Sequence, residues 1–299
     1  MILCCGESLI DMLPRTSTGN EPAFAPVAGG AVFNTAIALG RLGAASGYFG
    51  GLSTDLFGTI LADALAASKV DYSLCPRNAR PTTLAFVTLV DGQARYAFYD
   101  EGTAGRMLAT SDLPVLDDGT EALFFGGISL VAEPCASTYA TLCAHAGDRV
   151  VMIDPNIRPG FITDEGSYRA RLGEMLARAD IVKISDEDMD WLGATPEALI
   201  KGGSTLVLET RGAEGAVAVT ARDQITVPAR RATVVDTVGA GDTFNAGVLA
   251  GLSRAGLLSR AALRAASAEA LRPAITLGAE AAAITVSRAG ANPPWQHEL

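Results

Sequence analysis

The stretch Asp236-Thr237-Val238-Gly239-Ala240-Gly241-Asp242-Thr243-Phe244 decides how this chain folds and what it can bind, because it joins two glycines, a helix start and a carboxylate at fixed spacing. The apolar residues that follow have helical spacing, so the amides of residues 239–241 are expected to point at one spot and bind an anion there. Asp242 would lie beside that anion and could take the proton of an attacking hydroxyl, as phosphoryl transfer requires. The alternative is an ordinary glycine-rich loop with an acidic residue at a helix start.

The alternation of short apolar runs with helical patterns predicts an α/β fold with a mainly parallel central sheet flanked by helices. The expected strands are residues 1–5, 121–125, 150–153, 181–184 and 205–208. The expected helices are residues 32–42, 56–67, 135–146, 168–179, 243–254 and 261–277. Sheets of this class bind ligands at the carboxyl ends of their strands. No low-complexity linker divides the chain, so we expect one domain over residues 1–299.

Composition limits the partners. A net charge of −10 and a pI near 4.7 argue against nucleic acid or an anionic membrane. The five cysteines form no C-x-x-C pair and the chain has only two histidines, which argues against a disulfide framework or a zinc site. Reduced thiols and the lack of a signal-peptide pattern favour the cytoplasm, and no apolar run is long enough to span a membrane.

Two common nucleotide-binding motifs are missing from the sequence. None of the three lysines lies in the pattern of a P-loop. The glycines of residues 239–247 do not have the spacing of a dinucleotide-binding fold, which argues against a dehydrogenase.

The opening stretch resembles the C-terminal signature of the ribokinase-like (PfkB-type) carbohydrate kinases. Four further segments match that family in the same order: residues 6–11, 29–34, 154–158 and 288–291. The resemblance implies a ribokinase-like fold, ATP and Mg²⁺ as cofactors and, in many members, K⁺.

The resemblance also implies roles for individual residues. Asp242 would be the base, and Gly239, Ala240 and Gly241 would form the anion hole. The residues expected to bind the sugar are Asp11, Gly29, Gly30, Asn34, Phe98 and Arg158. The residues expected to bind the nucleotide are Lys183, Thr210, Arg211, Gly212, Gly215 and Gly241. Asp188 would hold Mg²⁺ through water, and Asp236 is a candidate ligand of a K⁺ site.

Within the family, residues 98–99, 127–135 and 183–188 look like fructokinase segments. We therefore expect an ATP-dependent kinase that phosphorylates a primary hydroxyl of a ketohexose, fructose giving fructose 6-phosphate. The alternatives are a 2-keto-3-deoxygluconate, ribose or nucleoside kinase, or a regulatory protein that binds sugar or nucleotide without turnover. Many relatives carry arginine where this chain has Asp100, and a carboxylate substrate would be repelled there unless Arg106 compensates.

Residues 82–90 and 93–99 are two β-rich runs joined by Asp91-Gly92, which is a strong hairpin signal. Following the resemblance, we interpret this hairpin as part of a β lid built mainly from about residues 12–28 and 82–105. The alternative is an edge hairpin without a ligand role. In some members such a lid also forms a subunit contact, so a homodimer through the lid is expected here.

Overall fold

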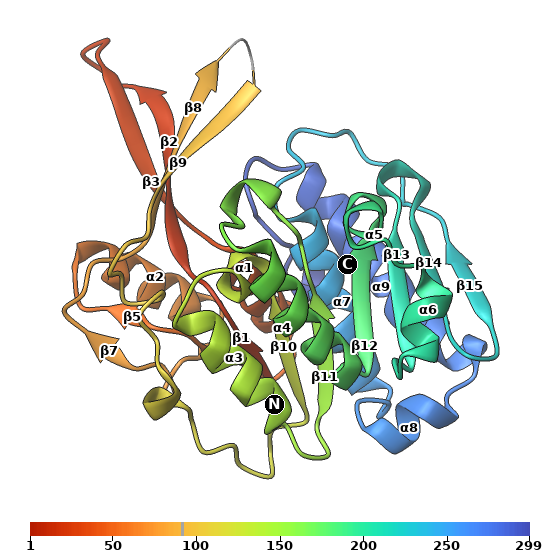
Figure 1. Ribbon diagram of the computed structural model, residues 1–299. Coiled ribbons are helices and arrows are strands. Elements are labelled where there is room, and N and C mark those ends of the chain that lie inside the picture. Colours follow the sequence, from red (N-terminus) through yellow and green to blue (C-terminus); the bar gives the residue numbers. More distant parts are fainter. Residues whose placement is uncertain (91–92) are drawn as a thin grey trace.

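A nine-stranded sheet runs through the middle of the protein (Figure 1). The computed structural model describes residues 1–90 and 93–299, with the side chains of residues 1–87 and 97–299. In spatial order the strands are β15 (Gln224–Val227), β14 (Ala216–Val219), β13 (Leu206–Thr210), β12 (Ile181–Ser185), β11 (Val150–Asp154), β10 (Ala122–Gly126), β1 (Ile2–Cys5), β4 (Ser46–Phe49) and β6 (Val70–Asp71). Neighbours from β6 to β13 pair in parallel, and β14 and β15 are antiparallel. This confirms the predicted sheet.

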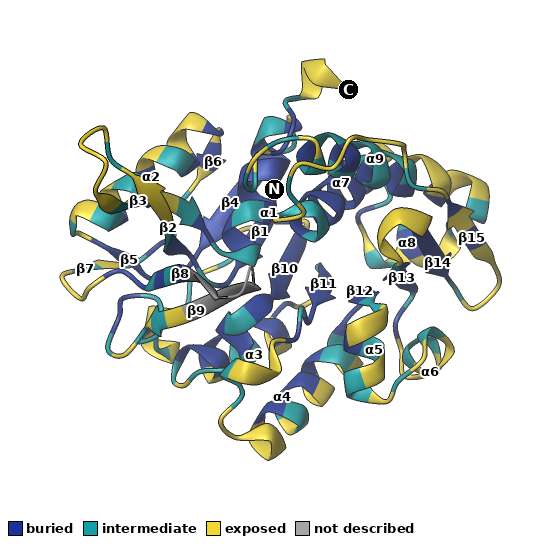
Figure 2. Cartoon of the chain, turned by 90° about the horizontal axis from the view of Figure 1, so that it is seen from above, coloured by how far each residue is buried: buried dark blue, intermediate teal, exposed yellow. Residues whose placement is uncertain are grey.

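Helices cover both faces of this sheet, and the strands are apolar on both faces for that reason. One face packs on α1 (Ala31–Arg41), α2 (Leu56–Ala67), α7 (Ala240–Arg254), α8 (Arg260–Ala265) and α9 (Ala268–Val286). The other face packs on α3 (Cys135–Ala144), α4 (Glu165–Arg178), α5 (Asp186–Leu192) and α6 (Pro196–Lys201). Successive residues of β1 serve the two faces in turn: Ile2 and Cys4 contact the first helix layer, and Leu3 and Cys5 the second. Figure 2 shows buried strands between helices whose outer faces are exposed.

The expected helix over 261–277 is wrong as one element, because the structure has two helices there, α8 and α9. Ala266 adopts an extended conformation, and the Ser267 hydroxyl caps α9 by accepting a hydrogen bond from the Ala270 amide. A serine cap offers the backbone an alternative to a continuing helix. The second helix then runs past the expected end to Val286.

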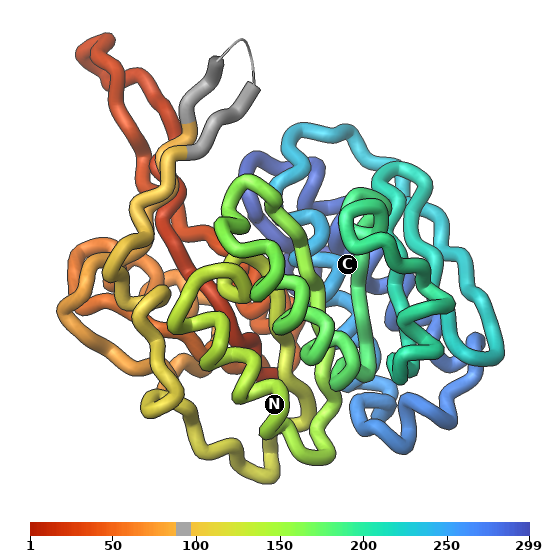
Figure 3. The backbone as a smooth tube through the Cα atoms, viewed as in Figure 1, coloured from red at the N-terminus to blue at the C-terminus, as the bar shows by residue number. Residues whose placement is uncertain are grey.

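A smaller four-stranded sheet projects from this core (Figures 1 and 3). Its order is β3 (Pro22–Gly29), β2 (Leu9–Thr16), β8 (Leu84–Val90) and β9 (Gln93–Tyr99). The strands form two antiparallel hairpins joined by parallel pairing of β2 with β8. Val90 pairs with Gln93, so the expected hairpin is present, while its Asp91-Gly92 turn lies outside the described residues.

Two short strands, β5 (Leu52–Ser53) and β7 (Arg77–Asn78), complete the strands of the described chain. Within residues 1–90 and 93–299, no helix has the length and apolar character needed to cross a membrane.

Candidate active site

The N-terminus of α7 forms the centre of the site. Gly239 precedes the helix with a φ of 77°, a conformation that glycine adopts without strain. A Cβ at Gly239 would also come within 2.6 Å of Ala291, so the loop and the C-terminal segment pack closely here. No side chain caps this helix. The Ala240 amide already donates to the Thr237 carbonyl at 3.3 Å. The other first amides and the positive end of the helix dipole are suited to binding an anion.

Asp242 lies in the first turn of α7 and is 8% exposed. Its Oδ2 atom accepts a hydrogen bond from Asn34 Nδ2 at 2.9 Å, which ties α7 to α1. Burial raises the pKa of Asp242 to about 7, although the hydrogen bond from Asn34 acts in the opposite direction. A carboxylate with a pKa near 7 can accept a proton from a substrate hydroxyl at neutral pH.

The glycine pair before α1 lies close to Asp11, as the proposed sugar site requires. A Cβ on Gly29 would collide with Asp11 Oδ2, and a Cβ on Gly30 would lie 2.8 Å from the Glu7 carbonyl. Gly30 also has a φ of 110°, which disfavours other residues. Burial raises the pKa of Asp11 to about 6. These positions need glycine to admit the carboxylate and to close the turn.

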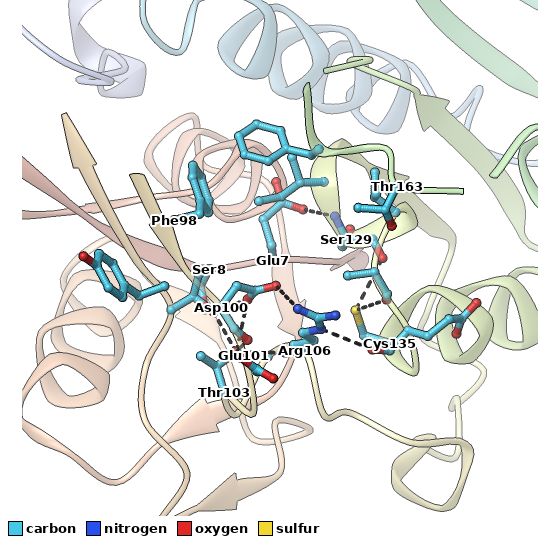
Figure 4. A pocket seen from close by; sticks show the side chains of 18 of the residues that line it. Glu7, Ser8, Phe98, Asp100, Glu101, Thr103, Arg106, Ser129, Cys135 and Thr163 are labelled. Carbon is cyan, nitrogen blue, oxygen red and sulfur yellow. Dashed lines mark hydrogen bonds and ion pairs between the residues drawn. The ribbon is translucent and has the colours of Figure 1, made fainter. Parts of the chain in front are cut away.

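A cavity of about 710 Å³ lies between β9, the segment 100–106, the turn at Gly127–Leu130 and residues 161–171 (Figure 4). Of the residues expected to bind the sugar, Phe98 lines this cavity, whereas Asp11, Gly29, Gly30, Asn34 and Arg158 are not among its lining residues. Phe98 lines it and packs edge-on against Phe161, with ring centroids 4.6 Å apart. Glu7, Ser8 and Ser129 also line the cavity. Its volume is in the range of small-molecule sites.

The structure changes the argument about Asp100. Its carboxylate accepts hydrogen bonds from the hydroxyls of Thr83 at 2.9 Å and Thr103 at 3.1 Å. Arg106 Nη1 lies 3.7 Å from Asp100 Oδ2, so the compensating charge is already in place (Figure 4). Repulsion of a sugar acid by Asp100 alone is therefore a weaker argument than the sequence indicated.

A buried polar network lies directly behind the start of α7. Lys183 Nζ is 3.2 Å from Asp154 Oδ2, and Asn245 Nδ2 donates to the same oxygen at 2.7 Å. A Cβ at Gly241 would lie 3.4 Å from Lys183 Nζ. Lys183 is 6% exposed, so the structure places it beneath the anion-binding turn.

Sequence reasoning assigned no role to Asn245 and Glu7, although each left a signal. Asn245 is a polar residue within the apolar run of α7, three positions after Asp242 and thus on the same side of the helix. Glu7 is an acidic residue directly after an apolar strand.

The expected nucleotide loop follows β13, which ends at Thr210. Gly212 and Gly215 have φ values of 52° and 103°. Arg211 is exposed, and its Nη2 atom lies 3.0 Å from Glu209 Oε2. The loop therefore follows the carboxyl end of a central strand, as expected for a nucleotide loop. Arg211, however, is paired with the carboxylate of Glu209.

Arg158 and Asp188 come together around one loop. Arg158 is exposed and its Nη1 atom donates to the Ile157 carbonyl at 3.0 Å. Asp188 is buried, and its Oδ1 atom accepts from the Ile157 amide at 2.8 Å. It also forms a capping box with Ser185 at the start of α5. Asp188 thus fixes the loop that presents Arg158.

Within residues 1–90 and 93–299, no cluster of three histidine, cysteine or acidic residues has metal-binding geometry. Asp236 instead joins two loops: its oxygens accept from the amides of Val238 at 3.0 Å and Gly290 at 2.9 Å. Carboxylate and backbone carbonyl oxygens are suitable donors for a hard cation, so the donor chemistry of Asp236 and its loops fits a K⁺ site. The Asp188 carboxylate, occupied by backbone donors, fits contact with a metal through water.

The sequence and the fold are matched by known proteins. Residues 1–298 match the pfkB family of carbohydrate kinases, and the chain belongs to this family. The curated fructokinase of Rhizobium leguminosarum bv. trifolii is 56% identical over 279 residues, covering 91% of this chain and 86% of that protein.

Solved structures agree with this assignment. A fructokinase with bound ATP from Xylella fastidiosa is 31% identical, with a TM-score of 0.88 and coverage of 97% of this chain and 93% of that one. A fructokinase double mutant from Vibrio cholerae O395, in fructose, ADP and potassium ion bound form, is 25% identical, with a TM-score of 0.84 and coverage of 97% and 93%. The predicted ribokinase-like fold and family are confirmed.

Proposed function

We propose that the protein is a fructokinase, which transfers the γ-phosphoryl group of ATP to the primary hydroxyl of fructose and forms fructose 6-phosphate and ADP. Membership in the pfkB family and 56% identity to a fructokinase support this substrate. The observation that carries the chemistry is the buried Asp242 carboxylate, bonded to Asn34 at the uncapped N-terminus of α7. This carboxylate lies in the anion-binding turn, and Asn34 links it to the glycine pair, because the Asn34 backbone amide donates to the Gly30 carbonyl.

In this mechanism Asp242 accepts the proton of the sugar hydroxyl while the hydroxyl oxygen attacks the γ-phosphorus. The bond from that phosphorus to the bridging oxygen of ADP breaks as the new bond forms. Amides of Gly239, Ala240 and Gly241 stabilise the negative charge of the transferred group. Arg158 supplies positive charge nearby once its loop contacts the substrate.

The sugar hydroxyls are bound by Asp11, Asn34 and the backbone of Gly29 and Gly30, and Phe98 packs on the sugar. A hydroxyl left unpaired in a closed site costs about 1–3 kcal/mol, so this polar set favours a polyol. The position of Asp11 against Gly29 supports this assignment.

The nucleotide is bound by Thr210, Arg211, Gly212 and Gly215, with Lys183 and Gly241 near its phosphates. Mg²⁺ bound with ATP would neutralise phosphate charge, and Asp188 would contact it through water. K⁺ would bind at the loop that contains Asp236. The related Xylella and Vibrio structures, with ATP bound in one and fructose, ADP and potassium in the other, support a nucleotide and a metal ion as ligands.

The small sheet of residues 9–29 and 84–99 would act as a lid, closing over the sugar to exclude water from the reaction. Phe98 and Asp11 lie on the face of this sheet toward the site. A cytoplasmic location is part of the proposal, since the five cysteines are free and buried and the reaction consumes ATP.

The proposal is tested by a coupled assay of ADP release over fructose, tagatose, ribose, 2-keto-3-deoxygluconate and adenosine. Fructose should give the highest kcat/KM. A higher kcat/KM for the sugar acid would assign the protein to the alternative kinase, and binding without ADP release from any acceptor would indicate a regulatory protein.

A further inference from the structure

Glu7 is an acidic residue of the cavity that the mechanism above does not use. It follows β1 and lines the cavity (Figure 4). Burial raises the pKa of Glu7, and hydrogen bonds to its carboxylate oppose that shift. A buried carboxylate persists only where several donors satisfy it, so its partners indicate what it holds in place.

The two oxygens of Glu7 contact two different parts of the site. Oε1 accepts from the Ala31 amide at 2.9 Å and from the Val32 amide at 3.5 Å. Oε2 accepts from the Ser129 amide at 3.2 Å. Helix α1 has Gly30 at its N-cap and no side-chain cap of its own, so Glu7 satisfies its first amides from outside the helix.

These contacts lie at the root of the small sheet. Glu7 stands two residues before β2 begins, and Ala31 stands two residues after β3 ends. Asn34 lies in the first turn of the same helix, three residues after Ala31. Its backbone amide donates to the Gly30 carbonyl at 2.8 Å, and its side-chain Nδ2 donates to Asp242 Oδ2. A short chain of hydrogen bonds through the first turn of α1 therefore connects Glu7 to the base.

We propose that Glu7 is a positioning residue: its carboxylate fixes the N-terminus of α1 at the root of the small sheet and thereby keeps Asn34 in place for both the sugar and Asp242. This inference rests on the proposed sugar kinase activity. In this role Glu7 affects the affinity for the sugar by holding α1 in position, and it does not itself serve as the base.

The first test is Glu7→Gln, which keeps the shape but replaces one accepting oxygen with an NH₂ group. One of the backbone amides then loses its acceptor. Hydrogen bonds to charged groups contribute about 1.5–3 kcal/mol, so the KM for fructose should rise by roughly tenfold or more. The KM for ATP should change by less than about twofold, because the backbone amides that Glu7 accepts from, those of Ala31, Val32 and Ser129, lie outside the nucleotide loop at residues 210–215.

Asp180→Asn is the matched control. Asp180 is also a buried carboxylate that accepts a backbone hydrogen bond, from the Val151 amide at 3.1 Å, and it pairs with Arg178 and Arg260. It lies at the opposite end of the strands from the site. This variant should lower Tm and leave both KM values unchanged, which separates loss of stability from loss of positioning.

A double-mutant cycle tests the route of the effect. In an Asn34→Ala background, Glu7→Gln should raise the fructose KM by less than about twofold, since its effect passes through Asn34. If Glu7→Gln does not fold, Glu7→Asp retains the charge with a shorter reach and should show the same split between the two KM values.

Three results would overturn the proposal for Glu7: a lower Tm with an unchanged fructose KM, an equal rise in both KM values, or additive effects of Glu7→Gln and Asn34→Ala. The wild-type assay separates these from a failure of the proposed function. A wild type that turns over no sugar argues against the kinase assignment. An active wild type whose fructose KM is unchanged by Glu7→Gln argues against the positioning role of Glu7.

Discussion

Asp242 combines a functional role with a cost to stability. Its pKa is about 7 in the folded protein and near 3.8 in the unfolded chain. Between these values the folded state binds more protons than the unfolded state, so this residue favours folding at low pH and that contribution is lost as pH rises through about 7. Removing the charge should therefore stabilise the protein above pH 7.

Thermal unfolding at pH 8 checks this prediction. Asp242→Asn should raise Tm by at least about 2 °C relative to the wild type, and the difference should shrink toward pH 5. An Asp242→Asn variant less stable than the wild type at pH 8 would show that the ionised carboxylate stabilises the fold.

The same pKa predicts the pH dependence of activity. A base must be ionised to accept a proton, so kcat/KM for fructose should fall as pH drops below about 7. A rate profile that stays flat down to pH 5 would contradict a base with this pKa.

Asp100 and Arg106 control the charge at the cavity wall. Asp100→Asn keeps acceptors for the Thr83 and Thr103 hydroxyls but removes the charge facing Arg106. Arg106 would then be free to pair with a substrate carboxylate, and the preference for fructose over 2-keto-3-deoxygluconate should fall by roughly tenfold. Comparing kcat/KM ratios measures this, with Asp63→Asn, at an exposed carboxylate outside the cavity, as control. If the ratio of kcat/KM for fructose to that for 2-keto-3-deoxygluconate did not change, Arg106 would have no role in choosing between these substrates.

Among the secondary-structure elements, the predictions succeeded where hydrophobic patterns were continuous. The strands around Val150 and Ile181 are apolar on both faces and were located within two residues. Strands β14 and β15 were missed because they are short and pair only after the chain turns back on itself. The break before α9 depended on one serine cap inside a pattern that was otherwise helical.

The site shows the same division. Residues 239–242 were located from local spacing, because one turn of helix holds them together. The contacts of Asp242 with Asn34 and of Glu7 with Ser129 join positions far apart in the sequence. Only the folded arrangement of β1, α1 and α7 brings those partners together.

The hairpin of β8 and β9 should move with the sugar. If the small sheet closes over the substrate, fructose should slow amide exchange in residues 82–90 and 93–105, and ATP alone should mainly protect residues 210–245. Hydrogen exchange with each ligand separately distinguishes these responses. Unchanged exchange in the hairpin would make it a static edge or a subunit contact.

For the molecule as a whole, one face of the small sheet carries a row of aromatic rings, and the ring at its end, Tyr99, also lines the cavity. Phe24 packs on Phe86 at 5.1 Å and Phe86 on Tyr99 at 5.5 Å, measured between ring centroids. Phe24 is 43% exposed and Tyr99 61% exposed. Exposed apolar surface of this kind is often covered by another chain, and a second copy of this protein is the proposed occupant.

Light scattering after size exclusion tests the dimer. The wild type should elute as a dimer, and Phe24→Lys, at a ring of the row that does not line the cavity, should shift it toward the monomer. Val115→Lys, at a residue that is 92% exposed and outside the small sheet, should leave the mass unchanged. A monomeric wild type would show that the aromatic row does not form an interface.

The role of Asp242 as the base of a fructose kinase is tested by the steady-state rate of fructose-dependent ADP release by the wild type and Asp242→Asn. We expect kcat to fall by roughly 10²–10⁴ in the variant, the range expected for loss of a positioned base. Fold and ATP binding should be retained, as circular dichroism and calorimetry would show. Near-normal turnover by Asp242→Asn would contradict the mechanism.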